Sequence, residues 1–157
     1  MPVTWISIDL SPLWISLKTA GLATIVTFCI GTAAAYGMLG YRGRWKSWIE
    51  GFLIAPLILP PTVVGFLLLL LFGRNGPLGQ WMLSFDFTII FTWYAAVIAA
   101  FVVSFPLMYK TALGAFEQVD ASLLQVARTL GASERRILLQ ILLPLAMPGL
   151  VAGATLA

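Results

Sequence analysis

Few residues of this chain could do catalytic chemistry. The sequence has no histidine and a single cysteine, Cys29, and only 10% of its 157 residues are charged. Its apolar stretches hold no nucleophile beside a base and no cluster of metal ligands, so an intramembrane enzyme is the weakest hypothesis and no cofactor is expected. The G-x-x-x-x-G-K-[ST] loop that cradles nucleotide phosphates is also absent. If ATP drives this protein, another chain must hydrolyse it.

The spacing that carries functional information lies in one polar interval, residues 117–144. We expect a short amphipathic helix in its first half, with Glu117 and Asp120 at the start, where the helix dipole favours negative charge. Apolar residues recur there at steps of three and four, which predicts a single apolar face. These residues are Val119, Leu123, Val126, Ala127 and Leu130.

A second short helix is predicted to follow directly. Gly131 can end the first helix, Ser133 can cap the second, and Glu134 falls in the first turn of the second. This helix is predicted to run over Glu134–Leu143 and to stop or bend near Pro144. Two helices that meet at a glycine make a rigid element able to transmit a push. The alternative is an ordinary amphipathic loop at the membrane surface.

Everything around this interval is typical of a membrane protein. The chain is 61% hydrophobic, and its charge content is far below the roughly 25% of a soluble domain. Thr19–Leu39, Gly51–Phe72 and Phe87–Tyr109 carry no charge, and each is long enough to cross a bilayer as a helix of about 20 residues. We therefore predict an all-α, polytopic helical membrane protein.

The predicted organisation is one transmembrane domain over residues 1–157. We place three complete spans at about 15–39, 51–72 and 87–109, a partial fourth span at 141–157, and a coupling element at 117–144. The last apolar stretch reaches Ala157 before it is long enough to cross the bilayer. We therefore expect a sequence that is truncated at its C-terminus, inside the fourth span.

The distribution of lysine and arginine predicts the orientation, because these residues collect in cytoplasmic loops. Two of the proposed loops carry seven of them, and the opposite side carries Lys18 and Arg74. The N-terminus is then outside the cell and the interval 117–144 is cytoplasmic. The net charge of +3 reflects this topology, and no basic patch for nucleic acid is predicted. The seven residues are Arg42, Arg44, Lys46, Lys110, Arg128, Arg135 and Arg136.

The second predicted span contains a helix break. Pro60 and Pro61 fall near its middle, and proline removes a backbone donor and clashes with the preceding turn. Transporters place pathways and gates at such mid-membrane breaks, so Pro60, Pro61, Thr62 and Gly65 are candidates for the wall or gate of a pathway. A kink that only improves packing is the alternative. The charge-free windows offer no proton relay, so the energy for any transport should come from elsewhere.

The polar interval resembles the cytoplasmic signature of bacterial ABC-importer permeases, written E-A-A, three residues, G, nine residues, I-x-L-P. Here Gln125-Val126-Ala127 is followed by three residues, Gly131, nine residues and Ile141-Leu142-Leu143-Pro144. Five signature positions match at full spacing. Gln125 stands where the signature has Glu, and Val126 where it has the first Ala, so a salt bridge from position 125 is not expected, although Gln can still hydrogen-bond.

Further segments resemble the molybdate-type permeases within the sulfate/molybdate group, and the similarity extends from the first span to Ala157. The segments that carry it are Leu57-Ile-Leu-Pro-Pro-Thr-Val-Val-Gly65, Gly73-Arg-Asn-Gly-Pro-Leu-Gly79, Ser104-Phe-Pro-Leu-Met108 and Ala127-Arg-Thr-Leu-Gly-Ala132.

The resemblance implies a permease subunit of an ATP-driven molybdate importer in the bacterial inner membrane. Its implied partners are cytoplasmic ABC ATPase subunits, a periplasmic or extracellular oxyanion-binding protein, and a second copy of the permease. The alternatives are a permease for sulfate, tungstate or another solute, and a membrane scaffold that recruits a partner without transport. By the same resemblance the coupling role falls on Gln125, Ala127, Arg128, Gly131, Ile141 and Pro144.

Overall fold

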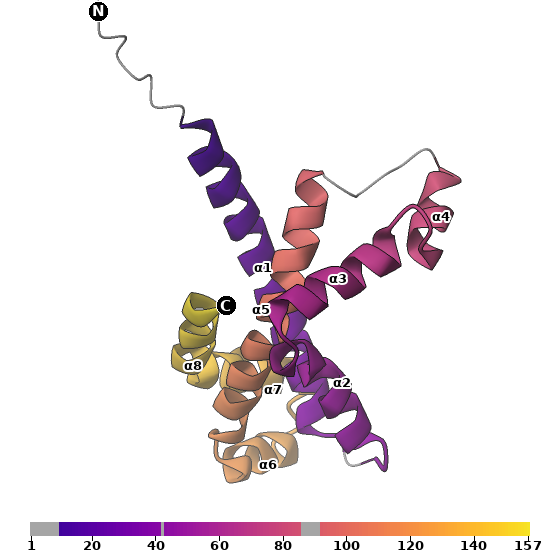
Figure 1. Cartoon of the computed structure of the whole chain (residues 1–157). Coiled ribbons are helices and arrows are strands. Elements are labelled where there is room, and N and C mark those ends of the chain that lie inside the picture. The colour runs from indigo at the N-terminus through magenta and orange to yellow at the C-terminus, as the bar shows by residue number, and fades with distance from the viewer. Residues whose placement is uncertain (1–9, 42, 86–91) are drawn as a thin grey trace, which may run out of the picture.

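The computed structural model describes residues 10–41, 43–85 and 92–157, and its regular elements in these ranges are all helices (Figure 1). The all-α prediction is therefore confirmed. Arg42 and positions 87–91 at the start of the third predicted span lie outside the described residues. The elements are α1 (Ser11–Leu39), α2 (Lys46–Ile58), α3 (Pro61–Phe72), α4 (Pro77–Leu83), α5 (Trp93–Glu117), α6 (Ala121–Thr129), α7 (Glu134–Ile137), the π-helical turn η1 (Leu138–Leu142) and α8 (Leu143–Leu156).

Three helices in the described part of the chain are long and apolar enough to cross a membrane. They are α1, α5 and the continuous 23-residue helix Glu134–Leu156, which comprises α7, η1 and α8. The pair formed by α2 and α3 passes the same test only when its two helices are taken together. This arrangement agrees with the predicted polytopic membrane protein.

The centre of the fold is the contact between α1 and α5, and small residues make it possible. Ala23, Thr27, Gly31 and Ala35 are buried at four-residue spacing, so they lie along one face of α1. Larger side chains such as Ile25 point outward and stay exposed. Burying large apolar side chains gains little when lipid tails are as apolar as the protein, so the close approach of small faces decides how such helices pack.

Two side-chain hydrogen bonds join α1 to α5. Near one end, Trp93 Nε1 donates to Thr19 Oγ1 at 2.6 Å. Further along, Thr27 Oγ1 and Ser104 Oγ lie 3.1 Å apart, and Thr27 is fully buried. Such bonds between membrane helices contribute about 0.6 kcal/mol on average, so they fix the register of the pair more than they stabilise it.

Helix α5 does not end where its apolar window ends at Tyr109. It continues through Lys110 to Glu117, because the residues after Lys110 are buried against α8. Met108, Tyr109 and Phe116 of α5 and Leu142 and Leu150 of the last helix are almost completely buried. A second packing layer, α5 against α8, is therefore built around this extension.

The second predicted span is two helices that meet at a bend of 111°. Helix α2 ends at Ile58, Leu59 and Pro60 are extended, with ψ of 142° and 140°, and α3 begins at Pro61. The residues four positions after Pro56 and Leu57 are prolines, which have no N–H to donate to those two carbonyls. The expected break is confirmed, and it turns the chain sharply rather than only kinking it.

The last helix corrects one expectation from the sequence. We expected the helix that begins at Glu134 to stop or bend near Pro144; it does not stop there but continues to Leu156. The turn before Pro144 widens to a π-helix, in which Leu143 N–H donates to Leu138 O, five residues back. Pro144 directly follows this π-turn as the second residue of α8. A π-turn placed before a proline thus lets the helix pass through it.

We predict that Gly31 is required for the α1–α5 contact and that Gly37, on the same helix, is not. A Cβ at Gly31 would lie 2.8 Å from Met108 Cγ, whereas a Cβ at Gly37 meets nothing within 4 Å. Gly31→Val should destabilise the protein by about 1–3 kcal/mol through overpacking. Gly37→Val changes helix propensity equally and should cost far less. Thermal unfolding of both variants in detergent measures this, and equal losses would contradict the packing.

Candidate functional site

The polar interval folds as expected into two helices joined at Gly131, and its backbone is tightly capped. Asp120 is the N-cap of α6 and accepts a 2.8 Å hydrogen bond from Ser122 N–H. That bond lowers the pKa of the Asp120 carboxyl, because it favours the charged form. Glu117, which we expected at the start of this helix, is instead the last residue of α5. Only Asp120 therefore caps α6.

Gly131 makes the turn out of α6 possible. Its φ is +79°, in the left-handed region that favours glycine. Gly131 N–H donates to Arg128 O and Ala132 N–H donates to Ala127 O, both at 3.0 Å. This is the paired hydrogen-bond pattern of a Schellman motif, which satisfies the last carbonyls of the helix. The predicted C-cap is confirmed.

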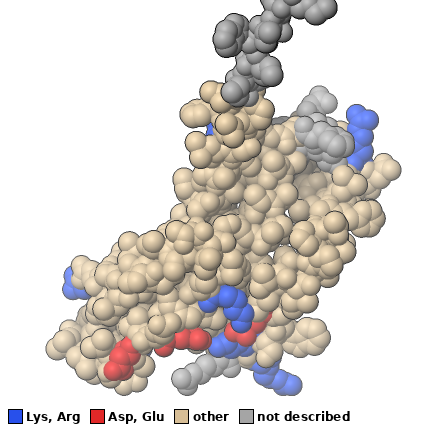
Figure 2. Space-filling model, turned by 60° about the vertical axis from the view of Figure 1, so that its left-hand side comes forward, with Lys and Arg blue, Asp and Glu red and all other residues tan. Residues whose placement is uncertain are grey.

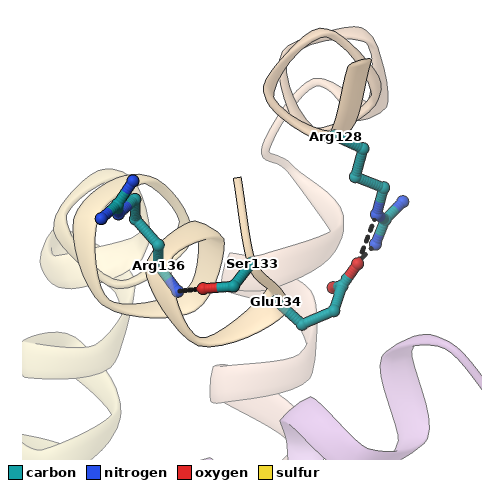
Figure 3. A network of polar contacts seen from close by, with 4 residues as sticks. All are labelled: Arg128, Ser133, Glu134 and Arg136. Carbon is teal, nitrogen blue, oxygen red and sulfur yellow. Dashed lines mark hydrogen bonds and ion pairs between the residues drawn. The ribbon is translucent and has the colours of Figure 1, made fainter. Parts of the chain in front are cut away.

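The next helix starts at once. Ser133 is its N-cap and accepts a hydrogen bond from Arg136 N–H at 3.4 Å, and Glu134 follows in the first turn (Figure 3). Both features were predicted. The described backbone from Asp120 to Pro144 is therefore regular, with only the short turn over 130–133 between its helices.

An ion pair spans this turn. Arg128 Nε donates to Glu134 Oε1 at 2.7 Å, and Arg128 Nη2 donates to Glu134 Oε2 at 3.2 Å (Figure 3). The hydrogen bond to Glu134 raises the pKa of the Arg128 guanidinium, because it favours the charged form. Sequence analysis missed this pair. Opposite charges on the two sides of a helix-ending glycine are the signal that could have revealed it.

The predicted apolar face of α6 divides into two parts. Ala127 is buried and Val119 packs against the core, as does Leu124, which the predicted face did not include. The larger residues Leu123, Val126 and Leu130 remain 50%, 56% and 82% exposed. We call these three residues the exposed apolar face. Apolar side chains that stay exposed together beside charged ones mark a surface fit for a partner.

The signature residues therefore take distinct places. Gln125 is exposed on α6, Ala127 anchors α6 to the core, and Gly131 makes the turn. Ile141 is half-buried within the π-turn, and Pro144 is exposed at the start of α8. The structure brings the first three together at one end of the molecule, and places the last two along the helix that leaves it.

Charged groups gather at that same end. On the face shown in Figure 2, the red carboxylates lie together with blue lysine and arginine side chains at the lower end, and a broad uncharged surface lies above them. Glu50 of α2 pairs weakly with Lys46 at 4.0 Å, and Glu117, Asp120 and Glu134 belong to the polar interval 117–144. A charged end next to a long uncharged surface is the pattern of a protein whose end emerges from a membrane.

The bend between α2 and α3 forms the second candidate site. Pro60, Pro61, Thr62 and Gly65 are all exposed there, and nothing lies within 4 Å of the position of a Cβ at Gly65. A cavity of about 580 Å³ lies between α2, α3 and α5. Every residue that lines it is apolar, including Phe52, Leu67 and Phe105, so it offers an oxyanion no side-chain donor.

The whole chain is similar to one protein family. Residues 2–157 match the family described as binding-protein-dependent transport system inner membrane component. The putative molybdenum transport system permease protein YvgM of Bacillus subtilis is 40% identical over 150 residues, which are 94% of this chain and 65% of that protein.

Two further relatives are also named as transport permeases. The molybdenum transport system permease protein ModB of Escherichia coli K12 is 42% identical over 144 residues, 91% of this chain and 63% of that protein. The probable transport system permease protein NifC of Clostridium pasteurianum is 35% identical over 144 residues, 91% of this chain and 50% of that protein. The chain thus spans less than two thirds of the length of these relatives.

Proposed function

Because this chain belongs to the family of inner-membrane components of binding-protein-dependent transport systems, we propose that it acts in the permease subunit of an ATP-driven molybdate importer. Helix α6 then docks on a separate cytoplasmic ATPase. The observation that carries the proposal is the exposed apolar face Leu123, Val126 and Leu130, presented by a helix that is capped at both ends. Such a face could also lie on the membrane surface, and the family match favours a protein partner.

The path for mechanical force follows from the packing. A push on α6 passes through the Gly131 turn to Glu134, which begins the continuous helix that runs to Leu156. That helix packs along α5, and α5 packs along α1. Because close-packed helices have low compressibility, a displacement that reaches the helix Glu134–Leu156 is passed on to α5 rather than absorbed within the packed core.

The signature residues have different parts in this proposal. Gln125 is exposed and can hydrogen-bond to the ATPase, in place of the charge that the signature has there. Ala127 must be small because it is buried where α6 meets the core. Arg128 and Gly131 shape the turn. Ile141 and Pro144 belong to the π-turn and its end, where α7 passes into α8.

The choice of solute and of the other partners rests on the relatives. The Bacillus and Escherichia relatives are named for molybdenum transport, so we propose molybdate as the solute, a periplasmic or extracellular oxyanion-binding protein that delivers it, and a second permease copy that completes the channel. Sulfate and tungstate are the competing oxyanions. The charged end that holds α6 faces the cytoplasm in this proposal, and the N-terminus lies outside.

The solute is tested by uptake. The complete subunit that carries this chain, reconstituted in liposomes with its ATPase and binding protein, is expected to take up labelled molybdate only with ATP. A tenfold excess of unlabelled molybdate should abolish the signal, and the same excess of sulfate should leave most of it. If sulfate suppresses the uptake as strongly as molybdate does, the assignment of molybdate as the specific solute is wrong. Uptake without ATP would contradict the importer itself.

The coupling role is tested at Gly131. A β-branched residue in the left-handed region costs about 1–2 kcal/mol, which changes the population of the turn by roughly 5–30-fold. No neighbour obstructs the site, so the effect of Gly131→Val comes from the backbone alone. We expect Gly131→Val to lower ATP-driven uptake by a similar factor while membrane insertion stays normal.

Gly131→Asn is the matched control, because asparagine tolerates a positive φ better than other residues with a side chain. It should retain most of the uptake. If Gly131→Val transports as well as the unchanged subunit, α6 does not transmit the force.

The bend between α2 and α3 is proposed as part of the pathway wall, with Pro60, Pro61, Thr62 and Gly65 near the solute. The support is physical. The backbone carbonyls of Pro56 and Leu57 lack a helical N–H donor because positions 60 and 61 are prolines, and inside a membrane a water-lined cavity can supply the missing partner. The apolar cavity on the α5 side of the bend cannot do so, which leaves the exposed side that carries Thr62.

Thiol labelling tests both this wall and the orientation. In a Cys29→Ala background, Thr62→Cys should react with a membrane-impermeant polar thiol reagent, and molybdate should slow the reaction. Leu130→Cys should react only from the cytoplasmic side. Ile25→Cys, on the exposed apolar surface of α1, should stay unreactive. If Thr62→Cys were as inert as Ile25→Cys, the bend would face lipid and not the pathway.

A further inference from the structure

Helix α6 is joined to the rest of the described protein by few contacts. Ala127 is its only buried residue, and Leu124 touches the core from the same side. The remaining side chains of α6 are exposed. A nine-residue helix held at so few points can rotate about its short connections unless something sets its direction.

The backbone hydrogen bonds do not set that direction. Those of the Gly131 turn run back into α6, from Gly131 to Arg128 and from Ala132 to Ala127. In the next helix, Ile137 N–H donates to Ser133 O, and Arg136 N–H donates to the Ser133 side chain, so these bonds reach back no further than Ser133. Among the described residues, no backbone hydrogen bond crosses from the part that ends at Ala132 to the part that begins at Ser133. The helices could therefore swivel at this junction, and the same pattern recurs at the other end of α6, where no backbone hydrogen bond among the described residues crosses from Val119 to Asp120.

The bonds that cross this junction come from the Arg128–Glu134 pair (Figure 3). Two N–H groups of the guanidinium meet two oxygens of the carboxylate, at 2.7 Å and 3.2 Å. A bidentate contact of this kind restrains orientation as well as distance, because the planar fork of arginine matches the carboxylate at two points. A lysine in place of Arg128 would hold the distance but permit rotation.

Exposure decides what this pair can do. The Arg128 and Glu134 side chains are 52% and 59% exposed, and exposed pairs contribute little to global stability. A stabilising role is therefore a poor explanation for the pair. Its position points to a geometric role, since it bridges the junction between the exposed apolar face and the helix Glu134–Leu156, which no backbone hydrogen bond crosses.

We propose that Arg128 and Glu134 form a strut that fixes the direction of α6 relative to the helix Glu134–Leu156, so that a displacement of α6 moves that helix instead of bending the junction. Both are positioning residues: they act through the placement of Leu123, Val126 and Leu130. The inference rests on the proposed coupling function and names the residues that make it stiff.

The geometric part is tested without any ATPase. Spin labels are placed at Ala121→Cys on α6 and Leu139→Cys on the following helix, both exposed, in the complete Cys29→Ala subunit in detergent. Pulsed electron–electron double resonance should give one narrow distribution of the distance between the two labels. Arg128→Gln should broaden it, and Arg128→Lys should broaden it to a smaller extent. The exchange of both charges, Arg128→Glu with Glu134→Arg, should narrow it again.

Arg135→Gln is the matched control. Arg135 is an exposed arginine on α7, next to Glu134, and it makes no ion pair with other described residues. Its loss removes one positive charge from the same region, as Arg128→Gln does, and should leave the distribution narrow. A distribution that stays narrow in Arg128→Gln, or that broadens equally in Arg135→Gln, overturns the strut.

The functional part is measured as molybdate taken up per ATP hydrolysed, on subunits without spin labels. Arg128→Gln should lower this ratio by roughly fivefold, the lower end of typical coupling between linked sites, while ATPase binding persists. The double charge exchange should restore the ratio, and Arg135→Gln should keep it. A ratio unchanged in Arg128→Gln overturns the role in coupling. If the unchanged subunit neither binds an ATPase nor transports, the proposed function fails, and the spin-label distances still decide whether the strut exists.

Discussion

The close contact between α1 and α5 is the interaction on which the remaining structure depends. In a membrane, large apolar side chains gain little by leaving lipid, so helices associate where small residues let their backbones approach. Ala23, Thr27, Gly31 and Ala35 make such a face on α1, and Met108 fits against the glycine. Because α5 is fixed on α1, its extension to Glu117 can serve as the surface on which the last helix packs.

This order of packing shows how an exposed element is joined to the buried core. The segment 118–133 is attached at both ends to helices of the same core: α5 leads into it, and the helix Glu134–Leu156 leads out of it and returns along α5. The interval itself contributes little to that core, with Ala127 as the buried point of α6. Its large apolar residues are thereby left available for a partner, and its caps and ion pair keep it in one shape.

Proline has two opposite effects in this chain, and the difference lies in its local surroundings. At Pro60 and Pro61 two adjacent residues lack an N–H, the backbone becomes extended, and the chain turns by 111°. At Pro144 a single proline follows a π-turn, in which Leu143 bonds five residues back, and the helix continues. Pro106 is a third case: it is buried inside α5, which runs through it. A proline alone therefore does not determine whether a membrane helix ends.

What the sequence by itself determined are the features set by short-range chemistry: helices that lack charge for the length of a bilayer, the break at Pro60–Pro61, the left-handed turn at Gly131, and the cap at Ser133. Each depends on the backbone preferences of residues a few positions apart. The tertiary structure decided which face of α1 packs, which half of the α6 face stays exposed, that Glu117 belongs to α5, and that the helix passes through Pro144. It also brought Arg128 onto Glu134. These outcomes depend on which surface lies opposite, and an apolar residue near a membrane can satisfy its burial equally well in protein or in lipid, so its identity alone cannot say which one it will meet.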